Sequence, residues 1–427
     1  MLFPQELVNL LIEFSEGDLP TLLSLCLVSR ACYHVARPLL YREVIAVSSF
    51  NRQVVVGKKL FSSVTSDSQL ASYVHELTLD SDCYCRESSM SMPRLLEVLH
   101  EALHSMTKLR KLRLTFPDGC VDEFPIDPLL VDHDFQLKAF FWRDFRWYVE
   151  QQAQLGQFLA LQPHIHTLEI VSGPDATPAS FDVPPTACPN VETFSGNFLY
   201  YKALAPTRPI TTFVWNGVSS VPMTIIDEMS APFSKLRVLI FHEGFPNNLN
   251  LRLLTSHLNS LEVLHLSLED TRTTFQSYQQ IQSAQNFVDH LHRLTNLRIF
   301  VLTVYPPRLQ FHEHTQCILA HEWFSALPHL ERAYLNGESM SSDELLCWTR
   351  GDALEPRRTH MEEVYEIYRT KYALETALLK PFSDISRFKH EEHSPIGREK
   401  MSGQKDLGLS FGWWKQLLNW DIISFFD

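Results

Sequence analysis

The chain has 427 residues, of which 45% are hydrophobic and 20% are charged, and its formal net charge is −13 at pH 7. This composition is that of a folded protein, and the length predicts several domains or a repeat array rather than one core. Without clusters of Lys and Arg, the acidic excess argues against a nucleic-acid partner, and no stretch has the roughly 18 apolar residues of a membrane span.

The chain opens with a predicted helix. Pro4 suits its first turn, because the amide that proline lacks would have no partner inside the helix, and Gly17 ends it. The apolar residues at helical spacing are Leu7, Leu10, Leu11 and Phe14.

Two further short helices are expected. Asp18 is placed to cap the second, which is apolar on nearly every side, and Ser29 is placed to cap the third. Pro38 is expected to interrupt the third helix. About forty residues form too small a core to bury all these apolar faces, so either the repeats that follow or a partner protein covers them.

Residues 2 to 44 resemble the F-box motif. The resemblance is carried by Phe3-Pro4-x-Glu6-Leu7, Leu25-x-Leu27-Val28-Ser29-Arg30, Tyr33 and Arg37-Pro38-Leu39-Leu40-Tyr41-Arg42. Phe3 stands where the family usually has Leu and Tyr33 where it has Trp, and both keep a large apolar body. The resemblance implies docking on the Skp-type adaptor of a cullin-RING ubiquitin ligase through Pro4, Leu7, Leu11, Ile12, Leu25, Val28, Ser29 and Tyr33.

From residue 70 onward an apolar pattern recurs: one apolar residue, two others, an apolar residue, one other, and often a third apolar residue. Its average spacing of about 28 residues lies at the long end of leucine-rich repeats. Each copy predicts a short strand, with helices such as residues 95–103 between copies. The ten copies begin at Val74, Leu109, Leu137, Ile165, Val191, Ile210, Leu236, Leu261, Leu297 and Leu330.

The predicted fold is therefore α/β: an F-box-like domain (1–48) followed by an irregular leucine-rich-repeat solenoid (49–350), with parallel strands on the concave face and helices outside. The whole chain resembles the F-box proteins that carry leucine-rich repeats. The Asn that usually follows the strand in such repeats is missing, so a plain α/β domain built from the same units remains an alternative.

Outward positions of the predicted strands are candidates for client binding. Several are apolar, and exposed apolar patches often mark contact sites. Another part of the same chain could equally cover them. The candidates are Phe141, Arg143, Val238, Ile240, His242, His265, Arg332 and Tyr334.

Three segments follow the repeats. Residues 351–382 are expected to contain a helix over 357–380, which ends before Pro381. Residues 383–406 are polar and predict a flexible linker. Residues 407–427 are strongly aromatic and could pack onto the repeats, bind a partner groove or rest at a membrane interface.

We find no Gly-x-Ser-x-Gly elbow, Gly-rich phosphate loop or Gly-x-Gly-x-x-Gly fingerprint. Cys83 with Cys85, and His312 with His314, lack the second ligand pair of a structural zinc centre. We therefore expect no catalytic residues, metal or cofactor. The eight cysteines do not form the dense framework of a secreted domain, and the N-terminus lacks a secretory leader pattern, which favours the cytoplasm or nucleus.

The function predicted is that of a non-enzymatic adaptor, which holds a ligase at one end and an unknown client protein at the other. The rival hypothesis is a repeat-based interaction protein whose F-box-like helices only cap the solenoid. The two differ at one face: Pro4, Leu7, Ile12, Leu25 and Val28 are exposed in the first and buried in the second.

Overall fold

The computed structural model describes residues 5–47, 60–80, 91–116, 127–130, 133–144, 149–172, 181, 183–216, 223–242, 251–269, 290–305, 313–336, 344–351, 355–375 and 378. The chain divides into two compact units, residues 1–165 with 395–427 and residues 166–394. No helix in the described ranges is both long and apolar enough to cross a membrane. Pro4, the predicted linker and the aromatic tail lie outside them.

The first unit begins with three helices, α1 (Gln5–Phe14), α2 (Leu19–Val28) and α3 (Arg30–Leu40). Both predicted caps are confirmed: the Thr21 amide donates to Asp18 at 3.2 Å, and the Cys32 amide donates to Ser29 at 3.1 Å. The predicted interruption at Pro38 is wrong, because α3 runs through it. The amide that proline lacks falls in the last turn, where the helix loses only one hydrogen bond.

Four parallel strands follow in the first unit, and neighbours in sequence are neighbours in the sheet. The strands are β1 (Glu43–Val47), β2 (Glu76–Asp80), β3 (Lys111–Phe116) and β4 (Ala139–Asp144). The other elements are α5 (Ser68–Ala71), α6 (Ser91–Ser105), the 3-10 helix η1 (Asp127–Leu130) and α7 (Val149–Ala160). The helix expected at 95–103 is thus confirmed as part of α6.

The second unit continues this pattern with seven parallel strands, β5 (Thr167–Ser172), β6 (Thr193–Gly196), β7 (Thr212–Trp215), β8 (Val238–Phe241), β9 (Val263–Glu269), β10 (Ile299–Tyr305) and β11 (Arg332–Asn336). Between them lie α8 (Phe198–Leu204), η2 (Ala205–Thr207), α9 (Met223–Glu228), α10 (Ser230–Phe233), α11 (Leu251–His257) and α14 (Glu313–Ala326).

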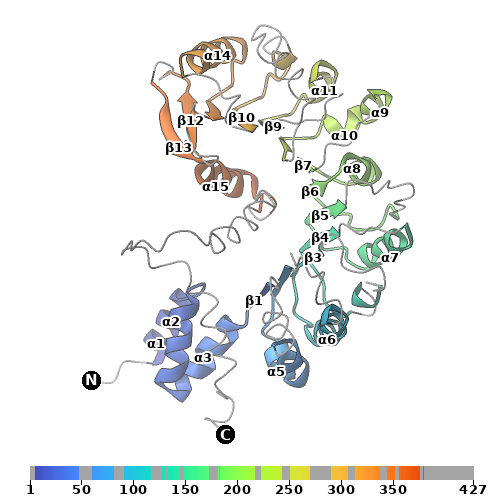
Figure 1. Cartoon of the computed structure of the whole chain (residues 1–427), viewed down its shortest axis with the longest axis vertical. Coiled ribbons are helices and arrows are strands. Elements are labelled where there is room, and N and C mark those ends of the chain that lie inside the picture. Colours follow the sequence, from blue (N-terminus) through green and yellow to red (C-terminus); the bar gives the residue numbers. More distant parts are fainter. Residues whose placement is uncertain are drawn as a thin grey trace, which may run out of the picture. The chain divides into compact units, whose positions relative to one another are not determined.

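The second unit ends with two antiparallel strands, β12 (Glu344–Thr349) and β13 (Arg357–His360), and with α15 (Met361–Tyr372). The helix expected over 357–380 is therefore wrong at both ends. Its first four residues form β13, and the chain leaves α15 at Ala373, which has a left-handed backbone (φ 51°). Helices α8, α9, α10, α11 and α14 lie on one side of the strands, whereas α15 lies on the other (Figure 1).

All ten repeat copies predicted from the sequence are confirmed to contain a strand. Each lies two residues before the first residue of a strand, from Val74 before β2 to Leu330 before β11. The apolar pattern therefore reports one repeated local structure. The chain is a mixed α/β protein with mostly parallel strands, compatible with a solenoid-like α/β fold. The sequence did not predict β1 or the antiparallel pair β12 and β13.

A shared hydrogen-bond acceptor marks the start of most strands. The carbonyl of Arg42 accepts from the amides of both His75 and Glu76, at 2.9 and 3.0 Å, and the carbonyl of His75 then accepts from Arg110 and Lys111. The same arrangement recurs before β4 and before β6 to β11. Each of these strands is therefore held in register at its first residue by the residue that precedes the neighbouring strand.

Aromatic side chains fill the core between the strands and helices of the second unit. The Tyr201 ring of α8 stacks on Phe213 of β7 at 4.2 Å between ring centroids, and Trp215 lies 5.1 Å from Phe241 of β8. Gly196, at the end of β6, permits close packing here. A Cβ at this position would lie 2.4 Å from the Ile170 carbonyl oxygen and 2.8 Å from the Phe194 ring.

Gly196→Ala is predicted to destabilise the second unit by about 3 kcal/mol, because the methyl group collides with backbone that cannot move without shifting β5. Gly17→Ala is the control. Gly17 has φ +87° but nothing within 4 Å of the added Cβ, so only backbone strain of about 1 kcal/mol is expected. Urea unfolding of both variants measures the difference, and equal midpoints would contradict the packing argument.

Candidate functional site

Large apolar side chains are exposed on the first two helices. Phe14 is 86% exposed and Val28 70% exposed. Among the described residues, ten large apolar side chains are exposed, and six of them belong to α1 and α2. We call this set the N-terminal apolar face, and its members are Leu7, Leu10, Leu11, Phe14, Leu27 and Val28.

The opposite sides of the helices form a small buried core. Its members are Ile12, Leu22, Cys26, Cys32, Ala36 and Leu40, and the half-buried Leu25 and Tyr33 pack against them. Burial raises the pKa of the Cys26 thiol to about 11, so this side chain stays protonated and packs as a small apolar group. The core uses one side of each helix and leaves the N-terminal apolar face open to water.

Charged contacts tie the three helices to the rest of the first unit. Arg37 of α3 pairs with Asp67, which also caps α5 by accepting the Leu70 amide at 3.0 Å. The same guanidinium lies over the ring of Tyr73, 6.0 Å from its centroid. Glu16, between α1 and α2, pairs with Arg42 just before β1. These contacts anchor the helices to the rest of the first unit.

The predicted ligase-binding residues divide by burial. Leu7, Leu11, Val28 and Ser29 are exposed, with Ser29 also capping α3, whereas Leu25 and Tyr33 are half-buried. Ile12 is fully buried, so the expectation that it faces a partner is wrong, because its side chain is needed for the helical core. The sequence did not single out Leu10, Phe14 and Leu27 as docking residues, although the helical spacing placed Leu10 and Phe14 on the same stripe as Leu7.

The predicted client-binding positions are mostly covered. In the first unit Phe141 and Arg143 are buried, and the Arg113 guanidinium lies 4.5 Å from the Phe141 ring centroid. In the second unit Val238, Ile240, His265 and Tyr334 are buried, while His242 and Arg332 are half-buried. The prediction that these positions form an open strand face is therefore wrong. Burial leaves only His242 and Arg332 partly accessible to a client.

In the second unit α15 supplies part of this cover. Tyr368 of α15 is fully buried, and its hydroxyl lies 3.4 Å from Nδ1 of His265 on β9. Tyr334 of β11 donates to Glu363 at 3.4 Å, and Tyr372 donates to Glu262 at 3.3 Å. These contacts join residues about 30 to 110 positions apart in the chain.

Glu363 is the polar centre of this contact. Burial acts to raise the pKa of its carboxyl group, but hydrogen bonds from Thr359 (2.6 Å) and Arg357 (2.6 and 2.7 Å) outweigh burial and lower the pKa below its ordinary value. Arg332 lies 3.8 Å away and adds to the effect. The carboxylate therefore stays ionised and holds β13, β11 and the start of α15 together.

His265 should make the second unit sensitive to acid. Burial, with a contribution from nearby His242, lowers the pKa of His265 from 6.5 to about 3. Because the folded pKa lies below the unfolded one, the stabilisation is complete above pH 6.5 and is lost as the pH falls from 6.5 towards 3, by about 1.4 kcal/mol per pH unit. His265→Gln should remove this part of the acid sensitivity.

Urea midpoints at about pH 7.5 and pH 5.5 measure the effect. The midpoint of the native chain should fall more on acidification than that of His265→Gln. Tyr368→Phe is the control, because it removes a hydroxyl from the same contact and keeps the titrating imidazole. Equal acid sensitivity in the native chain and His265→Gln would contradict the assignment.

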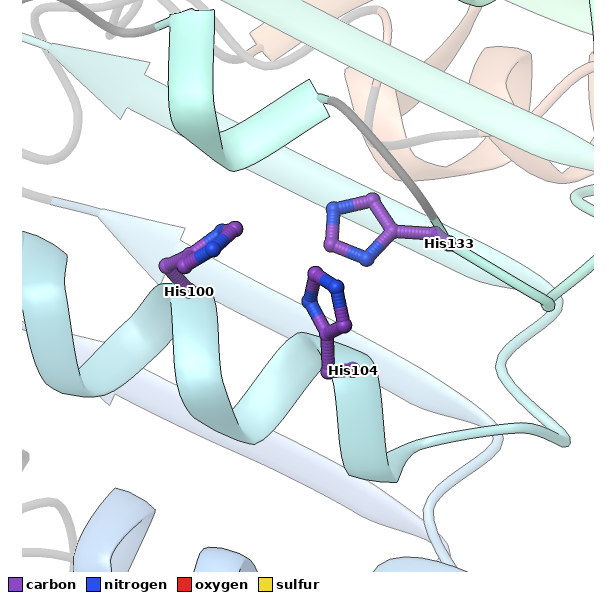
Figure 2. Close-up of side chains that lie close together, drawn as sticks. All are labelled: His100, His104 and His133. Atoms are coloured by element: carbon purple, nitrogen blue, oxygen red, sulfur yellow. The ribbon is translucent and has the colours of Figure 1, made fainter.

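The structure also gathers three histidines that the sequence did not single out. His100 and His104 of α6 lie beside His133, which precedes β4 (Figure 2). The spacing of His100 and His104 by four residues was the available signal. Cys83, Cys85 and His312, which the sequence had suggested as isolated pairs, lie outside the described residues, and His314 is exposed on α14.

Comparisons with known proteins assign no family. No family model matches the chain, and no curated protein matches it. Among solved structures, the chain is similar to a protein from Bacteroides fragilis at 13% sequence identity, over 63% of this chain and 68% of the other, with a TM-score of 0.33.

Proposed function

We propose that this protein is the substrate-recognition adaptor of a Skp–cullin–F-box ubiquitin ligase, and that it docks on the Skp-type subunit through its N-terminal apolar face. The observation that carries the proposal is the exposure of six large apolar side chains on two short helices. Apolar surface in water is unfavourable, and a group of exposed apolar side chains commonly marks a protein contact. The F-box resemblance of residues 2–44 supplies the identity of the partner.

The form of the face suits a helical partner subunit. Leu7, Leu10, Leu11 and Phe14 follow one stripe of α1, and Leu27 with Val28 extends the surface at the end of α2. Such a stripe is the pattern by which amphipathic helices dock into apolar grooves. The core residues behind it stay packed, so docking requires no unfolding of the module.

The remaining α/β structure is proposed to bind a client protein. Because strand-face positions such as Val238 and Ile240 are buried, client contacts would fall on other surfaces of the repeats or on the half-buried His242 and Arg332. The adaptor contributes no chemistry of its own. It raises the effective concentration of the client near the ligase. The location that goes with this proposal is the cytoplasm or nucleus.

The rival function is a repeat-based interaction protein whose N-terminal helices act only as a cap. A cap packs its apolar residues against the body that it covers. Exposure of Leu7 and Val28 disfavours this hypothesis. Ile12, which was expected to be exposed in an adaptor, is buried in the core of the helices themselves, so its burial favours neither function. The two functions therefore separate on whether the N-terminal apolar face binds a Skp-type subunit.

The double substitution Leu7→Asp, Leu11→Asp is predicted to weaken binding to a Skp-type subunit at least about thirtyfold, because each carboxylate would have to be desolvated in the contact. Both side chains are exposed, so the helices should keep their fold, which circular dichroism and thermal unfolding can check. The control is Ile318→Asp on α14, since Ile318 is 47% exposed and Leu7 is 46% exposed.

Binding is measured by titration of the purified subunit into the full chain. Native-like binding by Ile318→Asp and loss in the double variant would support the adaptor function. If the folded native chain does not bind, or the double variant binds equally well, the ligase proposal fails and the cap hypothesis takes its place.

A further inference from the structure

Three histidine side chains converge in the first unit. His100 and His104 project from α6, and His133 comes from the segment that leads into β4 (Figure 2). One nitrogen from each ring can be chosen so that all three lie within 4.8 Å of one another. The ring centroid of His104 lies 4.7 Å from that of His100 and 4.7 Å from that of His133, and the centroids of His100 and His133 are 6.0 Å apart. The ring planes meet at angles of 63° to 70°, so the rings pack edge to face instead of stacking.

Local structure fixes the two groups of rings independently. His100 and His104 are four residues apart in α6, which places both side chains on one face of the helix. His133 is held by η1 and by its own segment: its Nε2 lies 2.6 Å from the Leu129 carbonyl oxygen, and its ring stacks on Phe135, which precedes β4, at 4.7 Å between centroids. The cluster therefore depends on secondary structure rather than on free surface side chains.

The hydrogen bond of His133 sets which nitrogen is available to a ligand. A carbonyl oxygen only accepts, so Nε2 carries the proton and donates to Leu129. In a neutral ring the other nitrogen, Nδ1, then carries the lone pair. In metal-binding histidines, the N–H group of the second ring nitrogen commonly donates to a backbone carbonyl in this way, which fixes the orientation of the ring.

His100 provides a second observation that points to a ligand. Its Nδ1 is buried and has no hydrogen-bond partner within the described part of the chain. A buried ring nitrogen without a partner is unfavourable, and coordination through it would satisfy it. His104, by contrast, is exposed, which leaves a path from solvent to the cluster.

We propose that His100, His104 and His133 bind a zinc ion. Imidazole nitrogens suit zinc, whereas calcium and magnesium prefer oxygen ligands. Tetrahedral zinc requires nitrogens about 3.4 Å apart, given Zn–N bonds of about 2.0–2.1 Å, so binding would have to draw the nitrogens closer than their present separation of up to 4.8 Å, mainly by rotation of the exposed His104 ring. Glu101 stands between the helical ligands, so α6 carries the His-Glu-x-x-His pattern of zinc-binding helices.

Zinc at this site would join α6 to the segment before β4 and thereby stabilise the first unit. Because only three ligand residues gather there among those that the structure describes, the fourth position would be open to water or to a group from a bound molecule. Three protein ligands with one open position are typical of accessible rather than closed structural zinc sites. This inference does not depend on the proposed ligase function.

The test is titration of the full chain, without a polyhistidine tag, with Zn²⁺ alone after dialysis against a chelator. We expect one ion per chain and a rise in the thermal unfolding temperature, since an ion that binds only the folded state stabilises it. His104→Ala should weaken the affinity at least about tenfold, as expected for the loss of a ligand. Its exposure means that the substitution should leave the fold intact.

His314→Ala on α14 is the matched control, because it removes another exposed helical histidine and should bind zinc like the native chain. Co²⁺ substitution gives an independent readout, with visible absorption of a tetrahedral nitrogen site in the native chain and its loss in His133→Ala. Equal zinc affinity in the native chain and His104→Ala, or no stoichiometric binding by the native chain, would overturn the proposal.

Discussion

The carbonyl group that precedes each strand is the constraint on which the repeats depend. In β2 to β4, and again in β6 to β11, this carbonyl accepts two consecutive amides from the start of the next strand. A one-residue slip in a strand sends every side chain to the opposite face. The doubled hydrogen bond fixes the register before the first strand residue, so the leucines of every copy point to the same side. The register is thus set at strand starts, without the Asn that follows the strand in regular leucine-rich repeats.

The second unit covers both faces of part of its sheet. Strands such as β8, with the sequence Val-Leu-Ile-Phe, are buried on both sides, and a parallel strand between two covered faces is apolar throughout. The apolar residues on the outward face of β8 are therefore buried rather than exposed to water. Polar groups buried under α15 have partners there, as His265 does with Tyr368 and Thr303. The packing of α15 on the strands therefore depends on paired polar groups as well as on apolar contact.

The sequence predicted local structure well because each repeat start is a local pattern. All ten starts precede a strand by two residues, and the caps at Asp18 and Ser29 are present. It predicted poorly what depends on distant contacts. The strand β13 was assigned to a helix, since its stability comes from pairing with β12 rather than from its own residues. The cover of His265 by a residue 103 positions away has no local signature, and His133 joins α6 only once the start of β4 is placed by the Arg110 carbonyl.

The N-terminal apolar face and its core make opposite demands on the same two helices. The α2 sequence Leu-Pro-Thr-Leu-Leu-Ser-Leu-Cys-Leu-Val has almost no polar side, and a helix that is apolar all round must be covered all round. Packing against α3 buries Leu22 and Cys26 but cannot reach Leu27 and Val28. Ion pairs of Arg37 with Asp67 and of Arg42 with Glu16 help to hold the helices in this arrangement. An external surface is the remaining way to cover them, which is the physical reason to seek a partner at α1 and α2.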